Sequence, residues 1–276
     1  MIFQPFLFLF TLSFNSSSQY SKLPRLFIDL DSQSALQKDS IVLLSRDQQH
    51  YVQTVLRKKR NGAQIRCFDG LNGEWLCSVR YDGDGGGRRS SSVLSVVCDE
   101  LLRSQSAQND EHSLTIFFAP IKKPRMKFLI EKCTELSVNC FGVVQTDYTN
   151  ESSKGLNLEK LSIQAVEASE QSERLDVPIF VNSPSEKSVW TIQEILSYVT
   201  CSDNGGGGPL LICRERGHGV PVVSVLKNIC KVENNAKFLI GPEGGWSPEE
   251  EALFDKYERS HENVHSISFG ETILRA

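Results

Sequence analysis

The sequence predicts an α/β protein built in two parts, and three observations predict it. Short strand-like runs dominate the chain up to residue 104, which is typical of a compact β-barrel of about 80 residues. From residue 113 onward, buried apolar runs alternate with amphipathic helical patterns, which predicts an α/β domain with a largely parallel sheet. Residues 104–112 are polar and indicate a linker between the two parts.

The first part contains several short strands and one helix. Residues 24–29 alternate like a first strand, and residues 40–44 form a second apolar run. A helix is predicted over residues 48–59, followed by an Asn61-Gly62 turn signal. Residues 64–68 and 74–79 predict a hairpin, residues 82–92 a Gly-, Arg- and Ser-rich excursion, and residues 93–99 a further strand.

The second part alternates regularly between short apolar runs, typical of buried strands, and amphipathic patterns, typical of helices. Strands are predicted at residues 114–119, 140–144, 178–181, 209–213, 237–240 and 266–269. Helices are predicted at residues 124–136, 158–174, 190–199, 222–229 and 248–257. The carboxyl ends of parallel strands are where such domains usually bind ligands.

The stretch from residue 237 to 250 is the most informative in the chain. An apolar strand end, Phe238-Leu239-Ile240, runs into the glycine-rich turn 241–245, where side-chain-free positions allow close backbone approach. Ser247 then predicts a helix N-cap, with Pro248 at the first helical position and Glu250 completing a capping box. Residues 269–276 offer a second bare turn. We therefore expect a ligand to lie against the backbone of these turns.

Several classes of chemistry lack their sequence signals. The turn is neither a Walker loop nor a Rossmann fingerprint, and no Gly-x-Ser-x-Gly elbow occurs. The five histidines form no cluster, so we expect no metal site. The eight cysteines form no Cys-x-x-Cys pair and sit among apolar residues, which favours free buried thiols over disulfides.

Charge is distributed unevenly along the chain. The net charge is −4, but residues 22–104 carry +3 and residues 105–276 carry −7. The basic excess therefore points weakly toward a polyanion partner for the first part. Residues 1–21 carry no charged side chain, and their apolar run is too short to span a bilayer. We interpret them as either a targeting extension, with a chloroplast or mitochondrion as destination, or a disordered or mis-assigned start in a cytoplasmic protein.

Four groups of residues resemble one known family, the bacterial 16S ribosomal RNA uridine-N3 methyltransferases of the SPOUT superfamily. The opening 24–27 and the segments 50–57 and 68–70 resemble the family's small RNA-binding domain. Residues 132–136 and 165–174 resemble its helical signatures. The turn 240–245, followed at the family's spacing by Gly270-x-x-Ile-Leu-Arg275, resembles its two cofactor loops. The resemblance covers residues 24–276.

The resemblance implies a fold and a set of partners. It implies an extension at residues 1–22, a PUA-like RNA-binding β-barrel at 23–104, a linker at 105–112 and a SPOUT methyltransferase domain with a trefoil knot at 113–276. It further implies S-adenosylmethionine as the methyl donor, small-subunit ribosomal RNA as the substrate, a homodimer in the full-length form, and neither a membrane nor a metal. The family's final helix is not present after Arg275. We therefore expect a shortened domain with an incomplete knot and weak or no activity.

The resemblance also assigns roles to individual residues. Catalytic candidates are Arg275, Glu243 and Arg174, with Glu170 as an alternative to Glu243 for accepting the uridine N3 proton. Beside these roles, the run of charges predicts contacts to RNA phosphates by Arg25, Arg57, Lys58, Lys59 and Arg60, with a solvated helix end as the alternative for residues 57–60. The cofactor is expected against Leu239, Ile240, Gly241, Pro242, Glu243, Gly244, Gly245, Ser268, Phe269, Gly270, Ile273 and Leu274.

Each assignment has a structural alternative. The glycines of 241–245 also suit a plain strand–helix turn, and Glu243 also suits a hydrogen bond to nearby backbone. Arg275 also fits a solvated or interface position, and Glu167, Gln171 and Arg174 share a helix face that suits a salt-bridge set. For the whole chain, two other functions stay open: a non-catalytic RNA-binding paralogue or inactive short isoform, and a SPOUT methyltransferase acting on another RNA position such as a ribose 2′-hydroxyl.

Overall fold

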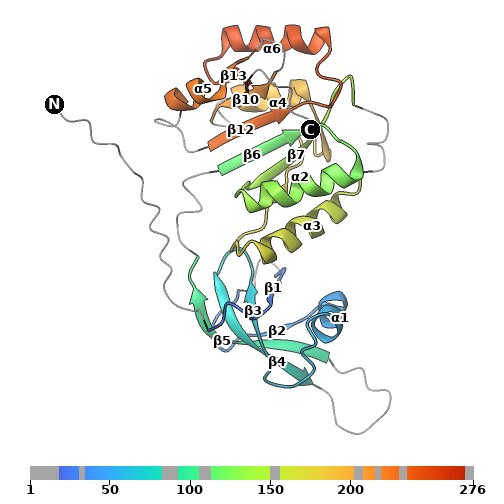
Figure 1. Cartoon of the computed structure of the whole chain (residues 1–276), viewed down its shortest axis with the longest axis vertical. Helices are drawn as coiled ribbons and strands as arrows, with labels where there is room; N and C mark the ends of the chain where they lie inside the picture. Colours follow the sequence, from blue (N-terminus) through green and yellow to red (C-terminus); the bar gives the residue numbers. More distant parts are fainter. Residues whose placement is uncertain are drawn as a thin grey trace, which may run out of the picture. The chain divides into compact units, whose positions relative to one another are not determined.

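The computed structural model describes residues 19–30, 35–82, 93–105, 113–149, 156–201, 208–214, 219–229 and 235–270. The chain divides into two compact units, Met1–Ser104 and Gln105–Ala276. Figure 1 shows a β-rich first unit and a second unit in which helices cover a sheet.

The first unit is a curled five-stranded sheet with one helix. The strand order is β1-β3-β4-β5-β2, in which β1 is parallel to β3 and the other neighbours are antiparallel. Alternate side chains of the strands form a core that includes Leu26, Ile65, Cys77 and Val96. The elements are β1 (Arg25–Phe27), β2 (Ile41–Leu43), α1 (Arg46–Thr54), β3 (Gln64–Phe68), β4 (Glu74–Asp82) and β5 (Val93–Arg103).

Helix α1 is shorter than predicted. It begins at a capping box between Ser45 and Gln48 and ends at Thr54, five residues before the predicted end. Arg57 has a φ of 53°, a left-handed conformation that no helix interior accommodates. Residues 57–60 therefore lie in a loop, and the hydroxyl of Tyr81 donates a hydrogen bond to the carbonyl of Lys58 (2.6 Å).

The second unit contains a parallel eight-stranded sheet, as predicted. The order is β11-β13-β10-β12-β6-β7-β8, and β9 also pairs with β7; every pair is parallel. The strands are β6 (Ser113–Phe118), β7 (Cys140–Gln145), β8 (Ile179–Phe180), β9 (Val189–Thr191), β10 (Leu210–Cys213), β11 (Val220–Pro221), β12 (Asn235–Ile240) and β13 (Val264–Ser268). The helices are α2 (Lys123–Glu135), α3 (Leu158–Gln171), α4 (Ile192–Thr200), α5 (Val222–Ile229) and α6 (Pro248–Ser260).

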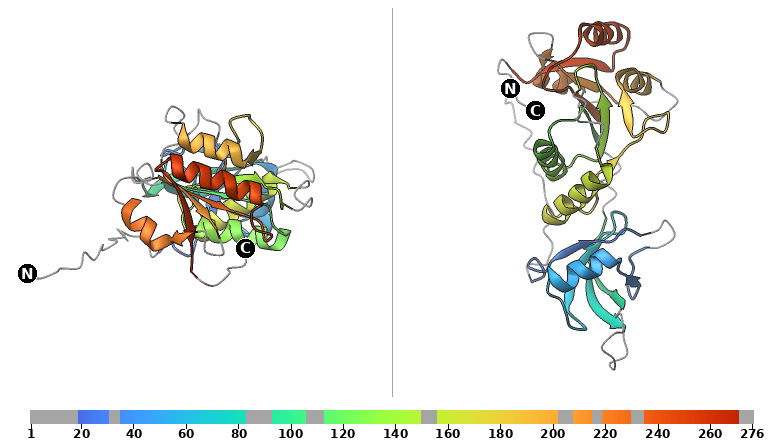
Figure 2. Two further views of the ribbon diagram at one scale, coloured as in Figure 1. Left: turned by 90° about the horizontal axis from the view of Figure 1, so that it is seen from above. Right: turned by 90° about the vertical axis from the view of Figure 1, so that its right-hand side faces the viewer.

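Helices lie on both faces of this sheet (Figure 2), and each face has its own apolar core. Phe118 and Phe141 pack with Met126 and Ile130 of α2 on one face. On the other face the core is built from sheet residues and from α4 and α6, and includes Phe117, Trp190, Ile195, Leu196, Leu239 and Phe254. Burial on both faces explains why the strands are continuous apolar runs rather than alternating ones.

Three details depart from the predicted elements. The first residues of the predicted helix 190–199 belong to strand β9, and helix α4 begins only at Ile192. The Thr191 side chain caps this helix by accepting a hydrogen bond from the amide of Glu194. The predicted helix 158–174 ends at Gln171, and Glu173 has a φ of 62°. Strand β11 was not predicted. Residues 271–276, on which the predicted knot depends, lie outside the described residues.

The cysteines of the described segments are free thiols, as predicted: Cys67, Cys77, Cys98, Cys133, Cys140, Cys201 and Cys213. The predicted burial holds for Cys67, Cys77 and Cys98 and was wrong for Cys201, which is exposed. Burial raises the pKa of Cys213 to about 12 and that of Cys133 to about 11. Within the described residues, no helix combines the length and apolar character needed to cross a membrane.

Candidate functional site

The two bare turns lie at the same edge of the parallel sheet. Strand β12 ends at Ile240 and β13 ends at Ser268, and β10 lies between them in the sheet. Because neighbouring strands are about 4.8 Å apart, the two turns are roughly 10 Å from one another. The fold therefore brings together backbone segments that are separated by more than twenty residues of sequence.

The first turn is held open by the absence of side chains. A Cβ on Gly241 would come within 2.9 Å of the Trp246 ring, and one on Gly244 would lie 3.3 Å from the Cβ of Tyr148. Gly245 has a φ of +76°, and its amide donates to the carbonyl of Pro242 (3.0 Å), closing the turn. The geometry requires glycine for close packing at Gly241 and for a left-handed backbone at Gly245.

The turn leads into α6 through the predicted capping box. The Ser247 Oγ accepts from the amide of Glu250 (3.2 Å), and Glu250 Oε2 accepts from the amide of Ser247 (2.8 Å). The second carboxylate oxygen of Glu250 accepts from the amide of Asp147 (2.9 Å), and Ser247 Oγ donates to Asp147 Oδ2 (2.5 Å). The loop after β7 is thus fastened to the start of α6, and it holds Tyr148 beside Gly244.

The second turn follows β13. Gly270 has a φ of +128°, its amide donates to Ser268 Oγ (3.2 Å), and Ser268 Oγ donates to the Gly270 carbonyl (3.1 Å). Phe269, between them, is 56% exposed. A Cβ at Gly270 or at Gly245 would meet no atom within 4 Å, so both turns present backbone to open space. The predicted site residues Ile273, Leu274 and Arg275 lie outside the described residues.

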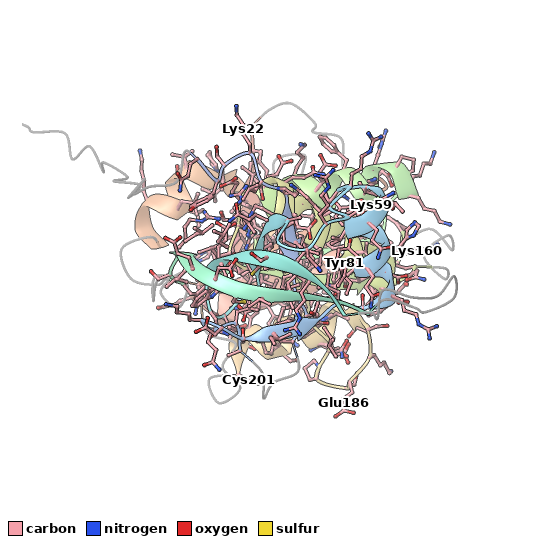
Figure 3. The ribbon with its side chains drawn as sticks, turned by 90° about the horizontal axis from the view of Figure 1, so that it is seen from below. Lys22, Lys59, Tyr81, Lys160, Glu186 and Cys201 are labelled. Atoms are coloured by element: carbon pink, nitrogen blue, oxygen red, sulfur yellow. The ribbon has the colours of Figure 1, made fainter. Side chains whose placement is uncertain are left out.

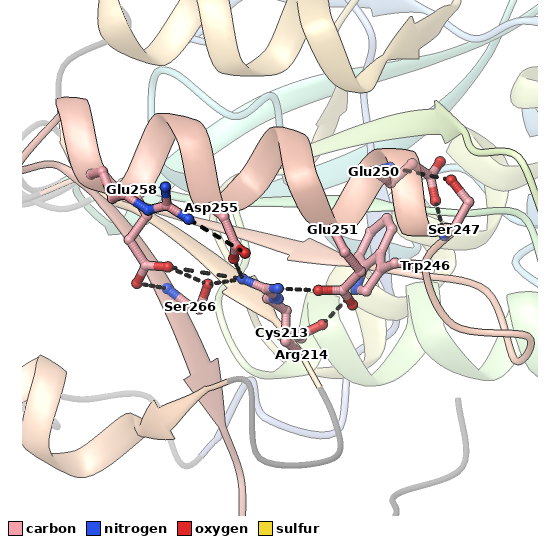
Figure 4. A network of polar contacts seen from close by, with 10 residues as sticks. Cys213, Arg214, Trp246, Ser247, Glu250, Glu251, Asp255, Glu258 and Ser266 are labelled. Atoms are coloured by element: carbon pink, nitrogen blue, oxygen red, sulfur yellow. Dashed lines mark hydrogen bonds and ion pairs between the residues drawn. The ribbon is translucent and has the colours of Figure 1, made fainter.

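A buried arginine after β10 connects this strand to β13 and to α6 (Figure 4). Arg214, directly after β10, ion-pairs with Glu251 and Asp255 of α6 and donates to Ser266 Oγ of β13 (3.0 Å). The neighbouring carbonyl of Cys213 accepts a hydrogen bond from Trp246 Nε1 (3.0 Å). These contacts hold β10, β13 and α6 together beneath both turns.

The turn also carries a solvent-accessible ion pair. Glu243 lies 3.4 Å from the guanidinium of Arg125, near the start of α2. Lys122, Lys123 and Lys127 surround Arg125 in sequence and are exposed, and the first turn of α2 contains no acidic residue. The start of α2 therefore places a group of cations beside the first turn.

The predicted catalytic residue Arg174 lies elsewhere. Its Nη1 donates to the carbonyls of Thr134 and Val138 (2.7 Å each), and its guanidinium forms a two-bond ion pair with Asp176. Val138 lies two residues before β7, so Arg174 is at the amino edge of the sheet, opposite the two turns. Within one chain, Arg174 has a structural role that joins the ends of α2 and α3.

The same topology separates the two carboxylates considered as proton acceptors. Helix α3 begins after the carboxyl end of β7 and runs back to the amino edge, where Arg174 follows it. Glu170 is in the last turn of α3, whereas Glu243 is in the turn after β12. Only Glu243 shares the carboxyl edge with the two turns.

Arg25, predicted to contact RNA, is instead part of a buried ion cluster. Its side chain is 2% exposed, it lies 2.5 Å from Glu74 Oε1, and its guanidinium stacks over the Phe68 ring at 4.3 Å. Arg66 and Arg103 pair with the same carboxylate, at 3.5 and 2.7 Å. Burial lowers the pKa of Arg25, and the Glu74 carboxylate opposes that effect. The geometry assigns Arg25 to the stability of the sheet, since a buried side chain does not reach a phosphate.

The other predicted RNA contacts are accessible. Arg57, Lys59 and Arg60 are exposed and Lys58 is half-buried, in the loop after α1. Figure 3 shows the Lys59 side chain on the first unit, whose underside faces the viewer. This loop therefore presents adjacent cations, although not on the helix that the sequence predicts.

Sequence reasoning missed Asp147, Arg214 and the group at the start of α2. A signal was present for Arg214: it follows a buried strand, and Glu251, Asp255 and Glu258 recur at helical spacing on α6. Asp147 had no local signal, because its partners are about a hundred residues away. Among the described residues, no group of three or more His, Cys, Asp or Glu side chains is arranged to hold a metal ion.

Two family models match the chain. Residues 108–276 match a model described as an RNA methyltransferase domain, and residues 44–85 match one described as an RNA methyltransferase PUA domain. The chain is 32% identical over 257 residues to a Rickettsia conorii protein called ribosomal RNA small subunit methyltransferase E, covering 92% of this chain and 91% of the relative.

Solved structures share the fold. One is a ribosomal RNA small subunit methyltransferase E from Neisseria gonorrhoeae bound to S-adenosyl methionine, with a TM-score of 0.68, 20% identity and coverage of 92% of this chain and 91% of that one. Another is a methyltransferase from Legionella pneumophila in complex with the same cofactor, with a TM-score of 0.66, 18% identity and 92% coverage of both chains. The family models thus give the predicted combination of a PUA unit and an RNA methyltransferase domain, and the solved structures share its fold.

Proposed function

We propose that this chain, which belongs to the RNA methyltransferase family, transfers a methyl group from S-adenosylmethionine to N3 of a uridine in small-subunit ribosomal RNA. The observation that carries the proposal is the meeting of two glycine-containing turns at the carboxyl edge of the parallel sheet, beside an exposed carboxylate and a group of cations. That edge is the usual ligand site of such sheets.

The turns fit the cofactor by their shape. Adenine and ribose need flat contact and backbone hydrogen bonds, and Gly245 and Gly270 leave the backbone uncovered, while Gly241 lets the Trp246 ring pack closely against the turn. We assign the cofactor to the segments 239–245 and 268–270, which Arg214 and Trp246 hold in fixed relation. When bound, S-adenosylmethionine supplies an electrophilic methyl group.

The protein's own task is to prepare the uridine. N3 carries a proton and is a poor nucleophile until that proton leaves, so a proton acceptor and a fixed orientation are needed. We assign the acceptor to the Glu243 carboxylate, because it lies in the turn itself, while Glu170 is at the far edge. Negative charge then develops on the uracil oxygens, and the neighbouring Arg125 guanidinium is placed to stabilise it.

The cations at the start of α2 suit the RNA backbone. Lys122, Lys123 and Lys127 are exposed near the turn, and the loop Arg57–Arg60 presents further cations on the first unit. Lysine and arginine contacts to phosphates position an RNA without reading its sequence. We assign each group to contacts with RNA phosphates.

A direct test is incubation with labelled S-adenosylmethionine and unmodified small-subunit ribosomal RNA, followed by nucleoside analysis. Labelled 3-methyluridine that is reduced at least tenfold in Glu243→Gln, but not in the exposed helix variant Glu249→Gln, supports the proposal. Label on a ribose 2′-hydroxyl favours the second SPOUT activity instead. RNA binding without any label favours a non-catalytic RNA-binding protein.

We further propose a homodimer. Phe128 on α2 and Leu136, the residue after α2, are 61% and 75% exposed, and we assign these two apolar side chains to the interface. Sedimentation velocity checks this: a dimer that Phe128→Glu converts to a monomer supports it, and an unchanged monomer for both proteins contradicts it.

For localisation we propose import into a chloroplast or mitochondrion directed by residues 1–22. The support is the absence of acidic residues in residues 1–21 and their Ser-rich end, although the segment lacks the arginines of a typical transit peptide. Fusing residues 1–22 to a fluorescent protein tests it, and a diffuse cytoplasmic signal would overturn it.

A further inference from the structure

An exposed aromatic ring lies beside the first turn. Tyr148, in the loop after β7, is 47% exposed. The buried aromatic rings of this unit pack against one another, as Trp246 does with Phe254 at 4.9 Å between ring centroids. Among the described residues, neither a second ring nor a cation stacks on Tyr148. An aromatic side chain is therefore left in contact with solvent at the edge of the sheet where the two turns meet.

The loop holds this ring on a fixed backbone. The amide of Thr149 donates to the carbonyl of Thr146 (3.2 Å), and Thr149 Oγ1 accepts from the amide of Thr146 (2.9 Å). These bonds close a turn that has Asp147 and Tyr148 at its centre. Hydrogen bonds at Asp147 fasten the turn to the start of α6. A ring on such a backbone is already ordered, so a flat ligand that packs on it loses less entropy on binding.

Tyr148 contacts the glycine-rich turn at Gly244. A Cβ on Gly244 would lie 3.3 Å from the Cβ of Tyr148 and 3.7 Å from its Cγ and Cδ2, so the missing side chain lets the tyrosine approach the backbone. The preceding residue is Glu243, whose carboxylate pairs with Arg125 of α2. The ring therefore lies next to the residue that we assign to accepting the uridine proton.

The strand order indicates which flat ligand meets the ring. The two turns follow β12 and β13, with β10 between them, whereas Tyr148 follows β7, on the other side of β12 and beyond β6. The ring is thus outside the interval between the turns, to which we assign the cofactor. It is on the side where α2 begins, with Lys122, Lys123 and Lys127 exposed. That side suits RNA, because cations contact phosphates and aromatic rings stack on unpaired bases.

We infer that the Tyr148 ring stacks on the target uracil, an unpaired base of single-stranded RNA, and holds it beside Glu243. The inference rests on the proposed function, because it names a residue that positions the substrate of that reaction. Stacking uses only the face of the base and leaves its N3 edge open to the carboxylate. Proteins commonly hold a base that is splayed out of a strand in this way.

The binding test compares two labelled strands of equal length by fluorescence anisotropy at low salt: a short oligouridylate and an abasic ribose-phosphate strand. Tyr148→Leu keeps an apolar contact with Gly244 but has no aromatic face. It should weaken oligouridylate binding at least about fivefold and leave the abasic strand unchanged. Tyr148→Phe should recover the lost affinity, because it restores the ring. Ile163→Ala, at an exposed apolar position on α3, is the control and should not alter oligouridylate binding.

A purely structural role for Tyr148 would weaken both strands, so equal losses overturn the inference. Unchanged oligouridylate affinity in Tyr148→Leu, or no binding of oligouridylate by the unaltered chain, overturns it as well. In the methylation assay, Tyr148→Leu should raise the KM for RNA more than it lowers kcat, because stacking is equally present in the bound and the reacting base. Binding of oligouridylate that depends on Tyr148, without formation of 3-methyluridine, would support the stacking and contradict methyl transfer at N3.

Discussion

The amide of Asp147 donates a hydrogen bond to a carboxylate oxygen of Glu250 across 2.9 Å, joining the loop after β7 to the first turn of α6. The other oxygen of the same carboxylate closes the capping box on Ser247. One nearly buried side chain thereby fixes both the start of the helix and the loop that packs on the glycine-rich turn.

Replacing Glu250 with Ala should therefore affect stability and ligand binding together. Loss of the cap and of the Asp147 contact should lower the free energy of unfolding by about 1–3 kcal/mol. The loosened turn should also weaken S-adenosylmethionine binding. Urea denaturation and calorimetry measure the two effects. Glu249→Ala, one residue away and exposed, is the matched control and should change neither.

Gly241→Ala should weaken cofactor binding while the fold remains. The added Cβ would lie 2.9 Å from the Trp246 ring, so the ring must move and its hydrogen bond to Cys213 is strained. We expect at least a tenfold loss of S-adenosylmethionine affinity by calorimetry. Gly62→Ala makes the same chemical change at a positive φ in open space on the first unit, and cofactor affinity there should not change. Unchanged affinity in Gly241→Ala would contradict the assignment of the turn.

Glu74→Gln should lower the free energy of unfolding of the first unit. The substitution leaves the side chains of Arg25, Arg66 and Arg103 around a neutral amide in place of their shared carboxylate. Breaking a buried ion pair typically costs about 3–5 kcal/mol. Chemical denaturation of the full chain measures the loss, and Glu100→Gln on the exposed side of β5 is the control. A loss no larger than that of the control would show that the cluster contributes little.

The loop after α1 should contribute to RNA affinity through its charge. Replacing Arg57, Lys59 and Arg60 together with Gln should weaken binding to small-subunit ribosomal RNA fragments. It should also reduce the slope of log affinity against log salt by about 2, given about 0.7 per phosphate contact on a single strand. Filter binding over a series of salt concentrations measures both. An unchanged slope would exclude phosphate contacts by this loop.

The thiols should differ sharply in reactivity. Cys201 is exposed, at the edge of the molecule in Figure 3, whereas burial raises the pKa of Cys133 to about 11 and of Cys213 to about 12. A raised pKa keeps a thiol protonated at pH 8, and only the thiolate reacts. Iodoacetamide at pH 8 should therefore modify Cys201 first, as read by peptide mass spectrometry. Modification of Cys133 or Cys213 at the same rate would contradict the burial.

Local sequence patterns were sufficient to predict most strands and helices of the second unit. The strands β6, β7, β10 and β12 and the helices α2, α5 and α6 fall within two or three residues of the predicted ranges, because apolar periodicity and the Ser247 capping box are short-range signals. The predicted end of α1 was wrong because the helix ends at a position that the local pattern does not mark. The apolar pattern continues past Thr54, but the left-handed backbone at Arg57 is set by packing of the loop.

The predicted roles of charged residues depended on information that no local pattern contains. Arg25 and Arg57 look alike in sequence, yet one is enclosed by Glu74 and Phe68 and the other is exposed. Arg174 lies near acidic residues in the sequence, and only the direction of α3 relative to the sheet places it at the amino edge, away from the turns.

By itself the sequence determined the two-part organisation, the parallel order of strands and helices, and the two bare turns, because each is encoded within a few neighbouring residues. Only the tertiary structure decided that these turns share one edge, that Glu243 rather than Glu170 lies there, and that Asp147 is bound to Glu250. Those relationships arise from strand order and register, which bring together residues about a hundred positions apart.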